Sequence, residues 1–94
     1  MKTEKQLALI ALGRQIRKVR QEKGFSQEHF ALEAGLDRSY YGGVERGERN
    51  LAALNLMRIA VALGVEVGEL FPKAEVFKDL LDEPASLGSS IEET

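Results

Sequence analysis

Apolar residues recur along this chain at the spacing of an α-helix, and the alternation that is typical of β-strands is nearly absent. One stripe at this spacing consists of Leu12, Ile16 and Val19. The apolar run over residues 7–12 indicates that the same helix buries a second face. The pattern predicts a first helix that begins near Thr3 and ends at Gly24, within an all-α fold.

Two short helices follow, and a turn that contains glycine joins them. Ser26 stands where it can cap the first of the pair, which Gly35 ends. Asp37 stands where it can cap the second, which the pattern extends from Arg38 to about Glu45. These residues predict a helix-turn-helix, a unit whose second helix can enter the major groove of DNA.

The second helix of this pair contains two adjacent glycines. Gly42 and Gly43 each cost about 1 kcal/mol relative to alanine in a helix interior. We expect them on the exposed face, where the absence of side chains would let the helix approach the groove closely. Of the two tyrosines beside them, we expect Tyr40 to face outward and Tyr41 to face the core.

The remaining sequence predicts a fourth helix and a short C-terminal extension. The fourth helix follows a loop over residues 47–52 and ends at Gly64. Its inward face consists of Leu56, Ile59, Ala60 and Leu63. A helical turn over residues 67–71 is then halted by Pro72. We expect residues 3–72 to form the helix-turn-helix domain.

Residues 73–94 form the extension, and it has two parts. The stretch over residues 73–81 is amphipathic at helical spacing. Residues 82–94 are acidic, rich in serine and poor in large apolar side chains, which predicts a disordered tail.

Composition excludes several classes of protein. The 94 residues include no cysteine and a single histidine, so disulfides, thiolate catalysis and Cys- or multi-His metal sites are not available. No apolar run approaches the ~20 residues that span a bilayer, and no export signal is evident. We expect a cytoplasmic protein that is not an enzyme and that needs neither a metal nor a cofactor.

The net charge of −2 hides an asymmetry between the two halves of the chain. Residues 1–50 carry ten lysines and arginines against seven acidic side chains, whereas residues 51–94 carry three against eight. A basic first half is typical of a protein with an anionic partner, although a solvated helix surface would show the same excess. Charge alone does not decide between the two.

The segment SQEHFALEAGLDRSYYGGVERGERN, residues 26–50, resembles the helix-turn-helix of lambdoid phage repressors and of the wider XRE family of transcription regulators. Within that family, LDRSYYGGVERGERN is most similar to the controller proteins of bacterial restriction–modification systems. The resemblance covers roughly residues 12–71. It implies a compact, five-helix, lambda-repressor-like domain that binds a palindromic operator in double-stranded DNA as a dimer.

The resemblance also implies roles for individual residues. Gln27 matches a phosphate contact, Arg38 and Ser39 match positions that read bases, and Tyr40 matches a contact to the backbone or groove edge. Residues of the following loop match phosphate contacts, namely Arg46, Arg49 and Asn50. We count Gly43 with the DNA-facing positions. Arg20 and Glu45 match a structural ion pair of the family.

The sequence departs from the family pattern at two positions. Gly42 stands where related controllers often carry serine, which removes one potential hydrogen bond. Ala52 stands where many relatives carry a Ser or Thr cap on the fourth helix, so Asn50 is the alternative cap.

A dimer needs an interface, and apolar residues after the fourth helix predict one. We expect it to be two-fold and to consist of Val65, Val67, Leu70 and Phe71. Leu54 or Leu56 could adjoin it. The stretch over residues 73–81 would either extend this interface or fold back onto its own subunit.

The sequence favours a sequence-specific DNA-binding regulator, which acts by occupying its operator and thereby blocks or recruits polymerase. Two alternatives stay open. One is the antitoxin of a toxin–antitoxin pair, with residues 73–94 binding a protein partner. The other is an adaptor that uses the same fold for protein interactions without contacting DNA.

Overall fold

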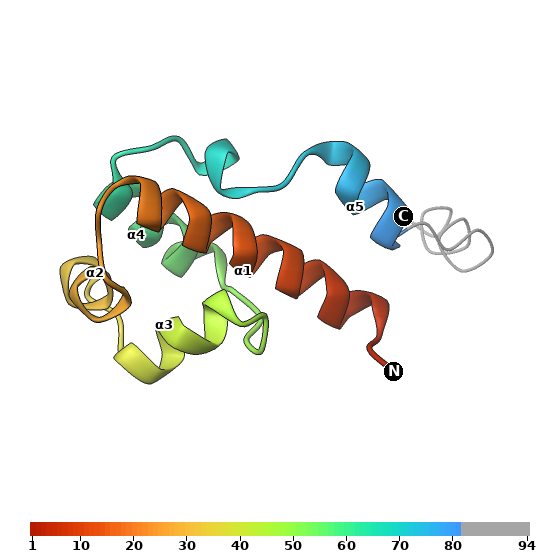
Figure 1. The fold of residues 1–94 in the computed structure, drawn as a ribbon, viewed down its shortest axis with the longest axis horizontal. Coiled ribbons are helices and arrows are strands. Elements are labelled where there is room, and N and C mark those ends of the chain that lie inside the picture. Colours follow the sequence, from red (N-terminus) through yellow and green to blue (C-terminus); the bar gives the residue numbers. More distant parts are fainter. Residues whose placement is uncertain (82–94) are drawn as a thin grey trace.

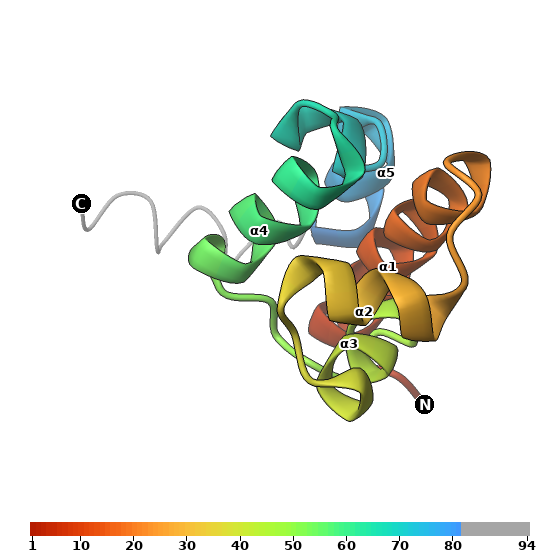
Figure 2. The same cartoon turned by 90° about the vertical axis from the view of Figure 1, so that its left-hand side faces the viewer.

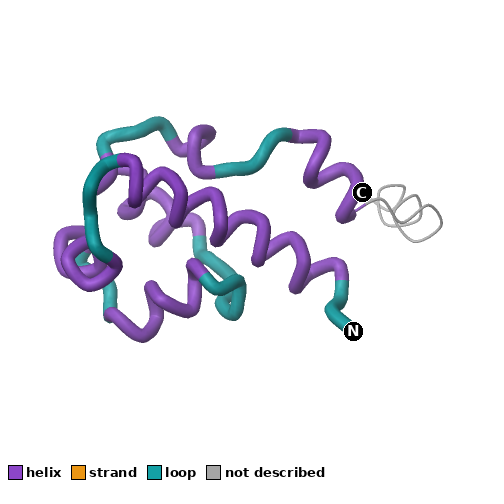
Figure 3. Tube along the Cα trace, viewed as in Figure 1, coloured by secondary structure: helices purple, strands orange, loops and turns teal. Residues whose placement is uncertain are grey.

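The computed structural model describes residues 1–81, which form five α-helices and one 3₁₀ helix and contain no strand (Figures 1 and 3). The helices in chain order are α1 (Glu4–Glu22), α2 (Gln27–Ala34), α3 (Arg38–Glu45), α4 (Ala53–Leu63), the 3₁₀ helix η1 (Val67–Leu70) and α5 (Ala74–Leu81). The predicted disordered tail over residues 82–94 lies outside the described residues. None of the helices in the described part combines the length and apolar composition needed to cross a membrane.

Local capping determines where the first three helices begin. Thr3 and Gln6 form a reciprocal capping box at the start of α1. The side chain of Ser26 accepts a hydrogen bond from the His29 amide of α2, and Asp37 does the same for the Tyr40 amide of α3. The predicted starts of these three helices are therefore confirmed.

The start of α4 differs from the prediction. Ala52 occupies the N-cap position in an extended conformation, and no side chain caps the helix there. The prediction that Asn50 supplies this cap is wrong, because the loop places Asn50 two residues ahead of the cap position. The first amides of α4 therefore lack a side-chain acceptor.

The core lies between α1, α2, α3, α4 and η1. Its largest fully buried side chains are Ile16, Phe30, Tyr41, Ile59 and Leu70. In Figures 1 and 2, α1 runs through the middle of the molecule, with α3 on one side and α5 on the other. Packing of α3 against both α1 and α2 fixes the orientation of the helix expected to enter DNA.

The extension over residues 73–81 folds back onto its own subunit. Helix α5 packs against α1, and the ring of Phe77 lies edge-on to the ring of Phe71, with 5.8 Å between their centroids. Of the two alternatives that the sequence left open for this stretch, the described structure shows the second.

Candidate nucleic-acid interface

One carboxylate fixes the C-terminal end of α3. Glu45 accepts hydrogen bonds from Arg20 Nε at 2.6 Å and Nη2 at 3.0 Å, from Gln27 Nε2 at 2.9 Å, and from the hydroxyl of Tyr41. A fifth hydrogen bond of this cluster, from Arg20 Nη1 to the Phe25 carbonyl at 2.7 Å, holds the turn before α2. The structure thus contains the Arg20–Glu45 ion pair, and the pair joins α1, α2 and α3.

The environment of this pair shifts the pKa values of its members. Burial by itself would raise the pKa of Glu45, but hydrogen bonds from Arg20, Tyr41 and Gln27 outweigh it, so the pKa is lowered. Burial raises the pKa of Tyr41, and its hydrogen bond to Glu45 adds to the effect. The hydrogen bond to Glu45 raises the pKa of Arg20. The cluster is therefore ionised as a guanidinium–carboxylate pair with a neutral phenol.

The residues expected to read bases lie at the opposite end of α3. Ser39 is exposed, and the side chain of Arg38 is 68% exposed. The guanidinium of Arg38 lies 3.2 Å from the Glu28 carboxylate, which is equally exposed. An ion pair so open to solvent contributes little free energy, so Arg38 can leave it for another partner.

Tyr40 is less free than the sequence suggests. Tyr41 is fully buried as expected, but Tyr40 is half-buried, and its hydroxyl accepts a hydrogen bond from Asn55 Nδ2 at 3.1 Å. The guanidinium of Arg49 lies 6.0 Å from the centre of the Tyr40 ring. Sequence reasoning missed Asn55, although a polar residue beside the apolar stripe of α4 was a usable signal.

The two glycines of α3 correct the sequence prediction. Gly42 and Gly43 are buried, so they do not form an exposed face. A Cβ on Gly43 would lie 2.9 Å from Cγ of Arg49, and one on Gly42 would lie 3.0 Å from Nη1 of Arg46. The space that the missing side chains leave is occupied by arginines of the same chain. The absence of side chains at the two glycines thus allows Arg46 and Arg49 to pack closely against α3.

The loop after α3 carries the remaining candidates. Arg46 forms a paired contact with Glu48, through Nε to Oε2 at 3.0 Å and Nη2 to Oε1 at 3.1 Å. Arg49 and Asn50 are exposed. Gln27, by contrast, is half-buried and already donates one amide hydrogen to Glu45, which leaves its second hydrogen for a phosphate.

The two segments that carry most of these candidates lie on one side of the molecule. In Figures 1 and 2, α3 and the loop that follows it lie along the lower side, and the N-terminus of the chain lies beside them. The helix that carries the residues expected to contact bases and the loop that carries those expected to contact phosphates therefore lie on the same side of the molecule.

The residues predicted to form a dimer interface do not share one environment. Leu70 is fully buried in the core of its own subunit, so its assignment to an interface is wrong. Its burial follows from the turn of η1, which points it between α1 and α4. Val65 and Phe71 are half-buried, the latter against Phe77, and Val67 is exposed.

Comparison with known proteins agrees with this geometry. The helix-turn-helix family profile matches residues 16–70. Control protein C.MunI from Mycoplasma is 43% identical over 67 residues, which cover 70% of this chain and 90% of that protein.

Solved structures match as well. The restriction-modification controller protein C.AhdI from Aeromonas hydrophila is 51% identical, with a TM-score of 0.66 over 67% of this chain and 96% of its own. A hypothetical transcription factor from Neisseria is 37% identical, with a TM-score of 0.67, and the match covers 81% of this chain and 87% of that protein. The chain therefore belongs to the XRE-like helix-turn-helix family of transcriptional regulators, and it is of the type that the restriction–modification control proteins represent.

Proposed function

We propose that the chain forms a dimer, binds a palindromic operator and regulates the genes of a restriction–modification system by occupying that operator. The observation that carries the proposal is the arrangement of arginines around α3. Arg38 is exposed at the start of the helix, where its ion pair with Glu28 is open to solvent, and Arg46 and Arg49 follow the end of the helix and pack against its glycines. The similarity to named control proteins supports the choice of regulated genes.

The geometry suits reading of the major groove. The groove admits one helix, whose first residues contact base edges. An arginine there can donate two hydrogen bonds to one guanine, and Ser39 can bond a base or a phosphate. Arg46 and Arg49 would then contact the phosphates beside the groove, which fixes the register of α3 without adding sequence information.

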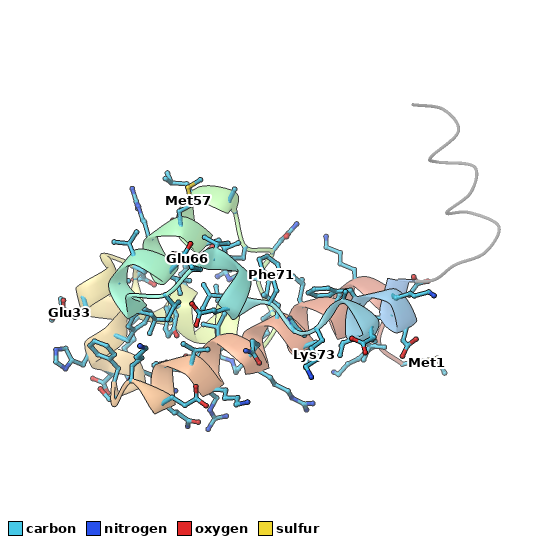
Figure 4. The ribbon with its side chains drawn as sticks, turned by 90° about the horizontal axis from the view of Figure 1, so that it is seen from above. Met1, Glu33, Met57, Glu66, Phe71 and Lys73 are labelled. Carbon is cyan, nitrogen blue, oxygen red and sulfur yellow. The ribbon has the colours of Figure 1, made fainter. Side chains whose placement is uncertain are left out.

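A second copy of the chain would cover the outer face of α4. This face carries three large apolar side chains that are strongly exposed, Leu54 at 58%, Met57 at 52% and Val61 at 81%. Figure 4 shows Met57 pointing away from the body of the molecule. Contiguous apolar surface of this kind marks interaction sites. Val67 would lie at the rim of the interface, in keeping with part of the sequence prediction.

This position is compatible with DNA binding by both subunits. In Figure 2, α4 lies at the flank of the molecule while α3 lies along its lower side. A two-fold axis beside α4 would therefore present both copies of α3 to one side. Half-sites would then lie about 34–36 Å apart, one turn of DNA.

The experiment that tests this function is selection of bound sequences from random duplex DNA, followed by titration against salt. We expect an inverted repeat whose half-sites are about one helical turn apart. Enrichment of a single half-site would contradict the dimer, and the absence of any enriched sequence would contradict sequence-specific binding.

Control of a restriction–modification system needs a separate test. The selected operator, placed before a reporter gene, should change reporter expression when the chain is supplied. In the source genome the operator should precede methyltransferase or endonuclease genes. Operators found only before unrelated genes would contradict this part of the proposal.

A further inference from the structure

A polar groove of about 580 Å³ lies between the first turns of α1 and the loop that follows α3. Its polar lining comes from both segments, and its charged and amide side chains are Lys2, Lys5, Gln6, Arg46, Glu48 and Asn50. The first turns of α1 precede the part of the chain that matches the helix-turn-helix family. The groove therefore joins a candidate phosphate-binding loop to residues outside that match.

The charge of this groove favours an anion. Three cationic side chains line it against the single carboxylate of Glu48, and that carboxylate is already paired with Arg46. Lys2 and Lys5 are exposed, and within residues 1–81 neither forms an ion pair. In the described part of the chain, two ammonium groups without an ion-pair partner thus line the groove together with Arg46 and Asn50, which are themselves expected to contact phosphates.

The two lysines are held in place relative to the loop. Gly47 has a φ of 77° and packs directly on α1, since a Cβ there would lie 2.5 Å from the Cα of Ile10. No other residue could make this approach without displacing α1. The capping box of Thr3 and Gln6 fixes the first turn of the helix between the two lysines. The spacing between lysines and loop is therefore set by packing.

The start of α1 lies on the side of the molecule that carries α3. Figures 1 and 2 both show the N-terminus at the level of α3 and its following loop, whereas α5 lies on the other side of α1. A duplex seated against α3 would thus run past the start of α1.

We propose that Lys2 and Lys5 bind DNA phosphates next to those contacted by Arg46 and Asn50, so that the contact with DNA extends beyond the helix-turn-helix. This inference rests on the proposed function, because it needs a duplex seated on α3. Each lysine that neutralises a phosphate releases condensed counterions and steepens the salt dependence of binding. The lysines would strengthen binding to operator and random DNA alike, since phosphates carry no sequence information.

The test compares two double variants of the full chain on the selected operator. Lys2→Gln/Lys5→Gln removes the proposed contacts, and Lys73→Gln/Lys78→Gln removes the same charge from the side of α5. For the first variant we expect the slope of log affinity against log salt to decrease by about 2. The ratio of the wild-type affinity for the operator to that of the Lys2→Gln/Lys5→Gln variant should then fall roughly tenfold between 50 and 200 mM salt. The second variant should keep the wild-type slope.

Phosphate ethylation interference locates the contacts. The wild type should show interference at phosphates outside those sensitive to Arg49→Ala, and Lys2→Gln/Lys5→Gln should lose the outer signal only. Lys2→Gln alone precedes the helix, so it should reduce the slope by about 1 without any change in helicity by circular dichroism.

Two outcomes overturn the inference, and they are distinguishable. If the lysine variant keeps the wild-type slope and interference pattern while Arg49→Ala loses affinity, the proposed function stands and the extended contact does not. If the wild type selects no operator at all, both proposals fail together.

Discussion

At the scale of single residues, Glu45 anchors the end of α3 to the rest of the fold. It receives donors from three helices, namely Arg20 of α1, Gln27 of α2 and Tyr41 of α3, and each of its two carboxylate oxygens accepts two hydrogen bonds. A buried ion pair of this kind adds little net stability, but breaking it is expensive. Glu45 thus holds the C-terminal end of α3 in position against α1.

Replacing Glu45 with glutamine should lower the free energy of unfolding by about 3–5 kcal/mol, because the guanidinium of Arg20 stays buried without a counter-charge. Glutamine keeps the size of the side chain and an acceptor for the Tyr41 hydroxyl. Urea unfolding at neutral pH measures the difference. Exposed Glu22→Gln is the matched control and should unfold like the wild type.

The same residue predicts how stability depends on pH. The folded-state pKa of Glu45 lies below its ordinary value of 4.5, so ionised Glu45 stabilises the fold above that value. This contribution is lost as the pH falls through the folded-state pKa. Unfolding measured at a series of acidic pH values should therefore show a steeper decline for the wild type than for Glu45→Gln. Parallel curves would contradict the assignment.

Arg38 and Arg49 should respond differently to replacement by alanine. Loss of Arg38 should cost about 1–3 kcal/mol on the operator and relax sequence preference, because the residue would contact a base. Loss of Arg49 should weaken all sequences alike and reduce the salt slope by about 1. Equal losses for Arg38→Ala on operator and random DNA would remove Arg38 from the residues that read bases.

At the scale of elements, α1 and α3 touch through their backbones. A Cβ on Gly13 would lie 2.5 Å from the carbonyl oxygen of Glu45 and would also meet the carbonyl of Val44. Backbone atoms cannot yield as a flexible side chain can, so Gly13 sets the distance between the two helices.

Gly13→Ala should therefore lower the free energy of unfolding by about 1–3 kcal/mol through overpacking, in spite of alanine's better helix propensity. Gly68→Ala is the control, since a Cβ on Gly68 in η1 meets nothing within 4 Å. Urea unfolding of both variants checks the difference. A Gly13→Ala protein as stable as the wild type would show that α1 can shift freely on α3.

Helix bounds were predictable from the sequence because caps act over three or four residues. Ser26, Asp37 and Gly35 each fix a helix end from local geometry alone. Packing across the chain was not predictable in this way. Arg46, which covers Gly42, lies four residues further on, directly after the end of α3. Arg49, which covers Gly43, lies six residues further on, in the following loop.

The candidate site shows the same division. Arg38 and Arg49 were identified because they stand in a recognisable motif, whereas the hydrogen bond from Asn55 to Tyr40 joins positions 15 residues apart. The burial of Leu70 likewise depends on how η1 turns back against α1 and α4. Apolar character alone does not distinguish a core position from an interface.

At the scale of the whole molecule, the side proposed to face DNA and the apolar outer face of α4 are separate surfaces (Figure 2). Val61→Asp should therefore act on assembly and not on folding. We expect the dimer dissociation constant to rise at least tenfold, a change of about 1.4 kcal/mol. Operator binding should weaken with it, because a lone subunit contacts one half-site. Sedimentation equilibrium measures the first effect, and titration of the operator measures the second.

The control for this variant is Val76→Asp, which makes the same change at an exposed valine of α5. It should assemble like the wild type. If Val61→Asp kept the wild-type dissociation constant, the outer face of α4 would be excluded as the interface.

The eight residues of α3 separate two tasks along the helix axis. Glu45, near its end, anchors the helix, while Arg38 and Ser39, at its start, make no contact that folding needs. Under the proposed function, substitutions at these first two positions would therefore change which sequence is bound at little risk to stability. Such a chain is readily re-targeted: new operator preferences can arise by drift or by engineering at two positions, while the scaffold that presents them stays the same.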